Sequence, residues 1–141
     1  MLYRCGILTP DSELDADIVC TLSGTKLSFE ASKRTLTVEI TENKKGYTLT
    51  VPMTADERIF GLGDDTRENV MVRGLKVDIY IANVASYGPM PVIMSSDGWG
   101  FVLNTTFRST IDCGSENPDE IRIDVSEGRG VRSWLKTEAS L

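Results

Sequence analysis

The sequence contains no histidine. Histidine is the side chain that most often moves protons at neutral pH, so its absence excludes the usual Ser-His-Asp and Cys-His hydrolases. It also removes a common ligand of zinc, and the three cysteines, Cys5, Cys20 and Cys113, have no Cys-x-x-Cys spacing that could replace it. From the residue types alone, we expect no metal site, no cofactor and no catalytic residue in the chain.

Long apolar runs and paired cysteines are missing too. Three thiols cannot all pair within one chain. The N-terminal sequence Met-Leu-Tyr-Arg-Cys-Gly lacks the apolar core, about 7–15 residues long, of a signal peptide. No stretch approaches the ~20 apolar residues of a membrane span. These absences predict a cytoplasmic protein with reduced, partly buried thiols and no membrane partner.

Basic residues are fewer than acidic residues in this chain. The chain has 15 Lys+Arg against 21 Asp+Glu, a formal net charge of −6. The basic residues are scattered, whereas a nucleic-acid partner would need a basic patch. We therefore expect no nucleic-acid partner.

Alternation of apolar and polar residues is the main pattern that is present. Leu36, Val38 and Ile40 alternate with polar residues, and the alternation resumes at 47–51 after a polar turn. A period of two is typical of a half-buried strand, so residues 35–51 are predicted to form a hairpin.

The same pattern continues along the rest of the chain, and no window shows a helical period. Turn signals recur about every 8–12 residues, as in β-sandwiches. The sequence therefore predicts an all-β fold, an antiparallel β-sandwich, in a single domain spanning residues 1–141. Further strands are expected around residues 18–20, 27–29, 77–81, 92–94, 99–103 and 121–125.

Residues 87–105 form the most clearly punctuated segment. Two prolines in the sequence Pro-Met-Pro at 89–91 hold the backbone extended and remove two donors, which predicts a rigid entry into a strand. Asp97 and Gly98 are the pair favoured in a two-residue type I′ turn, where both residues need a positive φ. Trp99 and two later apolar residues then alternate onto one face.

Residues 57–65 contain two patterns that suggest a functional site, a nucleotide-binding loop and a catalytic pair of acids, and we disfavour both. Gly61-Leu62-Gly63 begins like a nucleotide-binding loop, but no third glycine and no helix follow, so a structural turn is the better interpretation. Asp64 and Asp65 are the tightest pair of acids. Adjacent side chains in an extended chain point to opposite faces, which favours a solvated turn over a catalytic pair.

Several of these segments together resemble a known family. Residues 57–64, Glu-Arg-Ile-Phe-Gly-Leu-Gly-Asp, resemble the Glu-x-x-Tyr/Phe-Gly-Leu-Gly-Glu/Asp signature in the N-terminal domain of family 31 glycoside hydrolases, the α-glucosidases and α-xylosidases. The family's Arg-Gly turn is matched at 73–74, its Tyr-x-x-x-Pro entry at 87–91, its Ser-x-x-Gly-Tyr/Trp-Gly hairpin at 95–100 and an Asp-x-Gly step at 112–114.

The resemblance implies a β-sandwich of the galactose-mutarotase-like type, packed on a (β/α)8 catalytic barrel. Retaining enzymes of this family use two aspartates from the barrel strands, and such a pair must stand about 5–5.5 Å apart. The barrel sequence is absent here. The expected function is thus that of an N-terminal non-catalytic domain of a retaining α-glycosidase, inactive alone, which shares an oligosaccharide substrate with the missing barrel.

One loop of such a domain reaches the barrel mouth in this family. In many members it carries an aspartate several residues before the Tyr-x-x-x-Pro entry. The equivalent loop here is 81–86, which makes Asn83 the candidate substrate-binding residue. Asparagine can hydrogen-bond sugar hydroxyls but cannot hold a negative charge near an oxocarbenium ion. The alternative is that Asn83 bonds its own loop backbone.

Two aromatic residues have open roles. Trp99 could stack on a sugar ring, but its alternation with apolar neighbours favours packing in the core or in an interface. Tyr80 lies on the face opposite Ile79 and Ile81 and could line the 81–86 loop or face solvent.

The C-terminal residues depart from the family, because only Trp134-Leu135 echo its aromatic-rich strand. This implies a domain truncated at its C-terminal end. The barrel-facing surface would then be exposed and invite self-association, and loss of a last strand would leave a sheet edge unprotected. The alternatives are a free-standing carbohydrate-binding β-sandwich module and an interaction domain with no sugar role. A mutarotase proper is disfavoured, since those enzymes use histidines.

Overall fold

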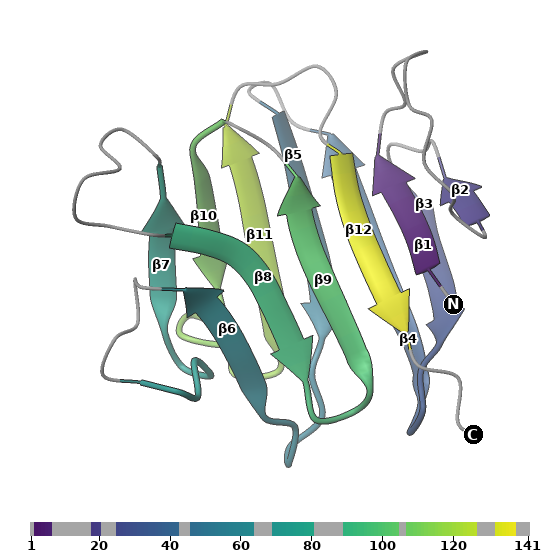
Figure 1. Cartoon of the computed structure of the whole chain (residues 1–141), viewed down its shortest axis with the longest axis horizontal. Coiled ribbons are helices and arrows are strands. Elements are labelled where there is room, and N and C mark those ends of the chain that lie inside the picture. The colour runs from purple at the N-terminus through teal and green to yellow at the C-terminus, as the bar shows by residue number, and fades with distance from the viewer. Residues whose placement is uncertain are drawn as a thin grey trace.

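Twelve β-strands make up the described part of the chain (Figure 1). The computed structural model describes residues 2–6, 18–20, 25–42, 46–63, 69–80, 89–104, 107–126 and 132–137. Within these ranges there is no helix, and hence none long and apolar enough to cross a membrane. The strands are β1 (Leu2–Gly6), β2 (Ile18–Cys20), β3 (Thr25–Glu30), β4 (Thr35–Glu42), β5 (Gly46–Pro52), β6 (Ile59–Gly63), β7 (Lys76–Ile79), β8 (Pro89–Ser95), β9 (Trp99–Asn104), β10 (Ser109–Asp112), β11 (Glu120–Ser126) and β12 (Arg132–Thr137).

The strands form two six-stranded sheets that pack face to face. The first, called sheet A, has the order β2-β1-β12-β9-β8-β6, and the second, sheet B, has the order β3-β4-β5-β11-β10-β7. Every neighbouring pair is antiparallel except β1 with β2. In Figure 1 sheet A lies in front of sheet B. The predicted antiparallel β-sandwich is confirmed.

The hairpin predicted over residues 35–51 is confirmed as β4 and β5. Ile40 and Leu49 are register partners, so the inward-facing residues of both strands share one face of sheet B. Leu36 and Val51 are completely buried, whereas the intervening threonines are not. The period of two therefore separates the core face from the outer face, as the sequence pattern requires.

A single apolar core fills the space between the sheets. Each large apolar side chain that it buries contributes about 1.5–3 kcal/mol to stability. Its members are Phe29, Leu36, Val38, Ile40, Tyr47, Leu49, Val51, Met53, Ile59, Leu62, Val72, Ile79, Ile93, Trp99, Phe101, Leu103, Ile111, Cys113, Ile121, Ile123 and Val125.

The C-terminal residues form a strand in the interior of sheet A. Residues 132–137 are β12, which pairs with β1 on one side and β9 on the other. The sequence pattern offered only Trp134-Leu135 as an echo of this strand. Long-range pairing supplies the rest, and the edges of sheet A are β2 and β6.

The hairpin between β8 and β9 differs from its prediction. Ser95 and Trp99 are register partners, which leaves a loop of Ser96, Asp97 and Gly98. Gly98 has a φ of 82°, but Asp97 is not among the residues with positive φ, so the predicted type I′ turn is wrong. A three-residue loop of this kind needs only one left-handed position, which the glycine occupies.

The Gly61-Leu62-Gly63 sequence belongs to strand β6 and not to a turn. The φ values are 130°, 67° and 62°, and Leu62 is the only non-glycine with positive φ among the described residues. The pairing of β6 with β8 shifts register between Gly61 and Leu62. This irregularity bends the strand and buries Leu62 completely, so the glycines serve the backbone and not a nucleotide.

Two glycines in sheet A allow a direct test of this backbone geometry. A Cβ on Gly61 would lie 2.1 Å from the carbonyl oxygen of Val92, whereas a Cβ on Gly100 would meet its nearest atom, the carbonyl oxygen of Ile93, at 3.5 Å. We expect Gly61→Ala to lower the free energy of unfolding by more than ~2 kcal/mol, and Gly100→Ala to change it by less than ~1 kcal/mol. Urea unfolding of the two variants measures both values, and equal losses would contradict the close approach at Gly61.

Candidate functional site

The predicted substrate-binding residue, Asn83, lies outside the described residues, as do Tyr87 and the pair Asp64-Asp65. The strands on either side of it are described. Strand β7 ends at Ile79, and Tyr80 is the last described residue before the segment. Pro89 begins β8 as the register partner of Gly63 on β6. The predicted role of Asn83 therefore stays a prediction, on a segment whose C-terminal anchor is a proline in a paired strand.

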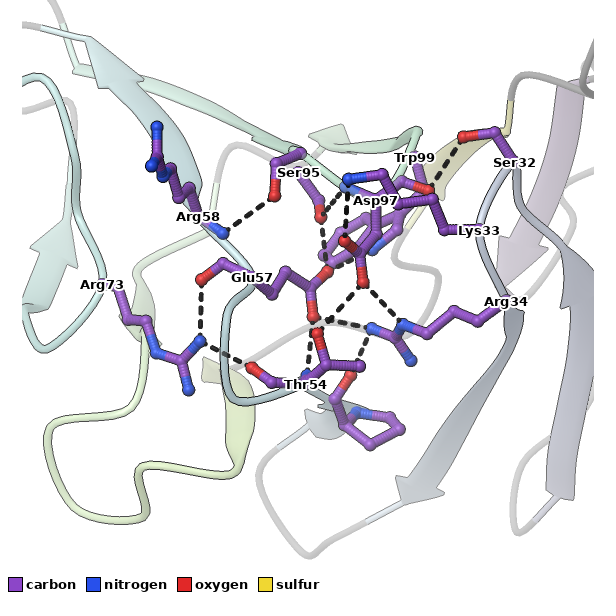
Figure 2. Close-up of polar contacts among 12 residues, drawn as sticks. Ser32, Lys33, Arg34, Thr54, Glu57, Arg58, Arg73, Ser95, Asp97 and Trp99 are labelled. Carbon is purple, nitrogen blue, oxygen red and sulfur yellow. Dashed lines mark hydrogen bonds and ion pairs between the residues drawn. The ribbon is translucent and has the colours of Figure 1, made fainter.

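A polar cluster with a buried centre lies at the other end of β8, where Glu57, Asp97 and Trp99 are buried. It contains the side chains of Arg34, Thr54, Glu57, Ser95, Asp97 and Trp99, here called the Glu57 cluster (Figure 2). These residues come from the β3–β4 turn, the β5–β6 loop and the β8–β9 hairpin. The cluster thus ties together three connections from both sheets.

Each carboxylate oxygen of Glu57 accepts two hydrogen bonds. Oε1 accepts from the indole Nε1 of Trp99 at 2.7 Å and from the hydroxyl of Ser95. Oε2 accepts from Nη2 of Arg34 at 2.8 Å and from the backbone N–H of Thr54 at 2.9 Å. A carboxylate in the protein interior is costly unless it is paired and hydrogen-bonded, and here both conditions are met.

Asp97 supplies the second carboxylate of the cluster. Its Oδ2 accepts from Nε of Arg34 and from the hydroxyl of Thr54, each at 3.2 Å. Its backbone carbonyl accepts from the hydroxyl of Ser32 at 3.0 Å, and its backbone N–H donates to the hydroxyl of Ser95 at 3.0 Å. Arg34 is therefore held between two carboxylates, and the β8–β9 hairpin is fastened to the turn that precedes β4.

Arg73, the arginine of the Arg-Gly turn, joins the same region through backbone oxygens. Its Nη1 donates to the carbonyls of Thr54 and Glu57, both at 2.7 Å, and its Nη2 donates to the carbonyl of Pro118 at 2.9 Å. The next residue, Gly74, donates its N–H to the carbonyl of Cys113 at 2.7 Å. Four separate motif segments, 57–63, 73–74, 95–100 and 112–114, therefore meet at this end of the sandwich.

The Glu57 cluster has no geometry for catalysis. The side chain of Glu57 has no exposed surface, and its oxygens are already fully used by protein donors. A substrate would have to break those bonds to reach it. The cluster fits a structural clamp that fixes the ends of β5, β6 and β9.

Trp99 is part of this clamp and not a sugar platform. It is 3% exposed, and its indole N–H is bonded to Glu57. The prediction that Trp99 packs in the core is confirmed. The alternative of a stacked sugar ring is wrong, because a buried ring has no face open to a ligand.

Sequence reasoning missed the partners of Glu57. Glu57 itself opens the family signature, but nothing in the sequence joined it to Arg34, which is 23 residues away, or to Trp99, 42 residues away. One signal was present: both Glu57 and Trp99 belong to matched motif segments. A hydrogen bond between two such side chains gives a structural reason for both motif segments to occur in the same order and at the same spacing as in the family.

Cys113 is buried in the core beside Asp112. Burial, together with the nearby Asp112 charge, raises the pKa of the Cys113 thiol from 9.0 to about 12. The thiol is therefore neutral at physiological pH, as a structural cysteine is. Among the described residues no three His, Cys, Asp or Glu side chains group as a metal ion would require.

Comparison with curated proteins finds a relative in Lactiplantibacillus pentosus. The chain is 25% identical to its alpha-xylosidase XylQ over 127 residues, which is 86% of this chain but 16% of the relative. The chain therefore spans about a sixth of the length of the curated relative that it matches. No protein-family model matches the chain.

Solved structures with the same fold include several glycoside hydrolases. A xylosidase from Aspergillus niger matches 90% of this chain and 23% of its own, with a TM-score of 0.57 and 15% identity. A dextranase of family 31 from Flavobacterium johnsoniae, complexed with isomaltotriose, matches 80% of this chain and 19% of its own, with a TM-score of 0.54 and 18% identity. At such identities the likeness establishes the fold.

Removing the charge of Glu57 should disrupt the Glu57 cluster and thereby destabilise the protein. In Glu57→Gln one carboxylate oxygen becomes an amide donor that faces other donors, and Arg34 loses a buried partner. We expect a loss of about 3–5 kcal/mol in the free energy of unfolding, measured by urea titration with tryptophan fluorescence. The matched control is Glu39→Gln, which breaks an exposed pair with Lys26 and should cost less than ~1 kcal/mol. Similar losses in both variants would contradict the structural role of Glu57.

The raised pKa of Cys113 predicts slow chemical modification. At pH 8 the native protein should leave Cys113 unmodified by iodoacetamide, and the unfolded protein should label it; peptide mapping distinguishes it from Cys5 and Cys20. Between pH 9 and 12 the unfolded thiol loses its proton while the native thiol keeps it, so the free energy of unfolding falls as pH rises. Equal labelling rates in the two states would overturn this assignment.

Proposed function

We propose, on the premise that this chain is a β-sandwich domain related to the family 31 glycoside hydrolases, that it is the non-catalytic N-terminal domain of an α-glycosidase. One observation carries the proposal. The matched motif segments 57–63, 73–74, 95–100 and 112–114 converge on a clamp whose Glu57 carboxylate is buried and bonded only to donors of the protein itself. Their order and spacing then serve a scaffold, and the chemistry belongs to another domain.

The reaction class follows from that premise. Retaining enzymes of this kind hydrolyse an α-glycosidic bond with two carboxylates about 5–5.5 Å apart, one a nucleophile and the other an acid/base. The relatives named above act as xylosidase or dextranase, so the substrate class that we propose is an α-linked glucose or xylose oligosaccharide. The two carboxylates would come from a (β/α)8 barrel that packs on this domain.

The contribution of this chain to the sugar site would be Asn83. The segment that carries it returns to the sheet at Pro89, and Pro91 follows two residues later in β8. Both prolines hold φ fixed, and Pro89 is also paired to β6, so this end of β8 is a stiff support. The Glu57 cluster holds the opposite end of β8, about 20 Å along the strand, and so fixes the support without touching the sugar. A cytoplasmic location completes the proposal.

A second candidate is a free-standing carbohydrate-binding module. One observation favours it: Tyr80, 54% exposed, directly precedes the segment that carries Asn83. An exposed aromatic ring can stack on a sugar, and an asparagine three residues later in the sequence could supply hydrogen bonds to its hydroxyls. This candidate differs from the first in one measurable respect, because a module binds sugar without a barrel.

Calorimetric titration of the 141-residue chain separates the two candidates. With maltose, isomaltose and a xylose-containing disaccharide, a scaffold domain should show no binding tighter than ~1 mM, or about −4 kcal/mol, and no turnover of nitrophenyl α-glycosides. Tighter binding that is lost in both Asn83→Ala and Tyr80→Ala would favour the module. Turnover by the purified chain would refute the assignment of catalysis to another domain.

A further inference from the structure

Four of the five methionines lie in the described part of the chain, and their side chains fall into two classes. Met53 is 8% exposed and belongs to the core, where its Cε would lie 2.8 Å from a Cβ placed on Gly114. Met71, Met90 and Met94 are 49%, 57% and 54% exposed. One thioether is therefore shielded by protein atoms, and the other three are open to small molecules in solution.

The three exposed methionines gather on the outer side of sheet A, around Phe60; they are called the methionine group. Met94 is the register partner of Phe60 across β6 and β8, and Met71 bridges to Phe60 on the other side. Adjacent strands lie about 5 Å apart, which puts the backbones of Met71 and Met94 roughly 10 Å from each other. Met90 precedes Met94 by four residues in β8, so the period of two turns both side chains to the same face.

Backbone hydrogen bonds hold both neighbours of β6 in place. On one side the N–H of Val72 donates to the carbonyl of Ile59 at 2.8 Å, and on the other the N–H of Ser96 donates to the carbonyl of Arg58 at 2.9 Å. The exposure of the methionine group is thus a property of the native sheet and requires no unfolding.

The cysteine and the tryptophan whose side chains the structure describes are shielded from oxidants. Cys113 has no exposed surface, and burial raises the pKa of its thiol to about 12. The thiolate is the form that peroxides oxidise, so the neutral Cys113 is a poor target. Trp99 is 3% exposed. Among these described side chains, oxidation of the native chain is therefore directed to the methionine group.

We propose that the methionine group is a site of reversible oxidation by peroxides, which converts an apolar part of sheet A into a polar one. The thioether sulfur gives two electrons to hydrogen peroxide and bonds to one of its oxygens, the O–O bond breaks, and the other oxygen leaves as water. The flexible apolar side chain becomes a polar sulfoxide. A methionine sulfoxide reductase reverses the step by releasing that oxygen as water while a dithiol is oxidised to a disulfide. This inference concerns the chain alone and does not depend on the proposed glycosidase role.

Treatment of the native 141-residue chain with hydrogen peroxide, followed by peptide mapping, tests the proposed site. We expect Met71, Met90 and Met94 to become sulfoxides at least ~10-fold faster than Met53, because Met53 reacts only when the core opens. In urea all four should react at similar rates. Oxidation of Met53 in the native chain as fast as that of the methionine group would overturn the assignment of the site.

Retention on a hydrophobic-interaction column measures the change in the surface. The oxidised chain should elute earlier than the untreated chain, and it should return to its first position after treatment with the two epimer-specific methionine sulfoxide reductases and a dithiol. A chain whose three exposed methionines are fully oxidised but whose retention is unchanged would overturn the proposed change in polarity.

The matched control is the triple variant Met71→Leu, Met90→Leu and Met94→Leu. Leucine keeps an apolar side chain of similar volume and has no sulfur, so peroxide should leave the retention of this variant unchanged. A triple variant that shifts as much as the wild type would assign the change to other residues and refute the proposal. Circular dichroism of each sample, together with the three single variants, keeps a folding defect apart from a change in the surface. No sugar is added, so each result is distinct from a failure of the proposed function.

Discussion

The buried carboxylate of Glu57 is the constraint on which this end of the sandwich depends. It receives hydrogen bonds from three different parts of the chain: the arginine before β4, the loop before β6 and the tryptophan that begins β9. Such a charge is stable only while every donor is in place, since an unpaired buried charge is far more costly than a lost surface contact. The clamp therefore couples the β3–β4 turn, the β5–β6 loop and the β8–β9 hairpin at one end of the sandwich, while the apolar core holds the rest of the two sheets together.

This arrangement explains why a recognisable motif need not be catalytic. The Glu57 carboxylate, the Arg73 guanidinium and the Trp99 indole are reactive or recognition groups in many active sites. Here each has its hydrogen-bonding capacity directed at protein atoms. The chain thus resembles the hydrolase family through residues that hold a scaffold, consistent with a domain that supports chemistry performed elsewhere.

The two faces of the sandwich show how the same alternation can serve different ends. On sheet B, outward positions hold threonines and paired charges, which suit water. On the β6, β8 and β9 part of sheet A, outward positions hold methionine, valine and phenylalanine. Apolar groups left at the surface of an otherwise charged protein gain from being covered. The same period of two thus gives a polar outer surface on sheet B and an apolar one on the β6, β8 and β9 part of sheet A.

The sequence by itself determined the fold class, the β4–β5 hairpin, the core position of Trp99 and the family resemblance, because these depend on local alternation and on motif spacing. It could not determine that Asp97 lacks the positive φ of a type I′ turn, that Gly61 and Leu62 sit within an irregular strand, or that residues 132–137 lie between β1 and β9. Those outcomes were decided by the tertiary structure. A buried carboxylate is bonded by whichever donors lie near it in space, and a strand pairs with neighbours that are distant in the sequence. The order of the residues alone does not specify either of these contacts.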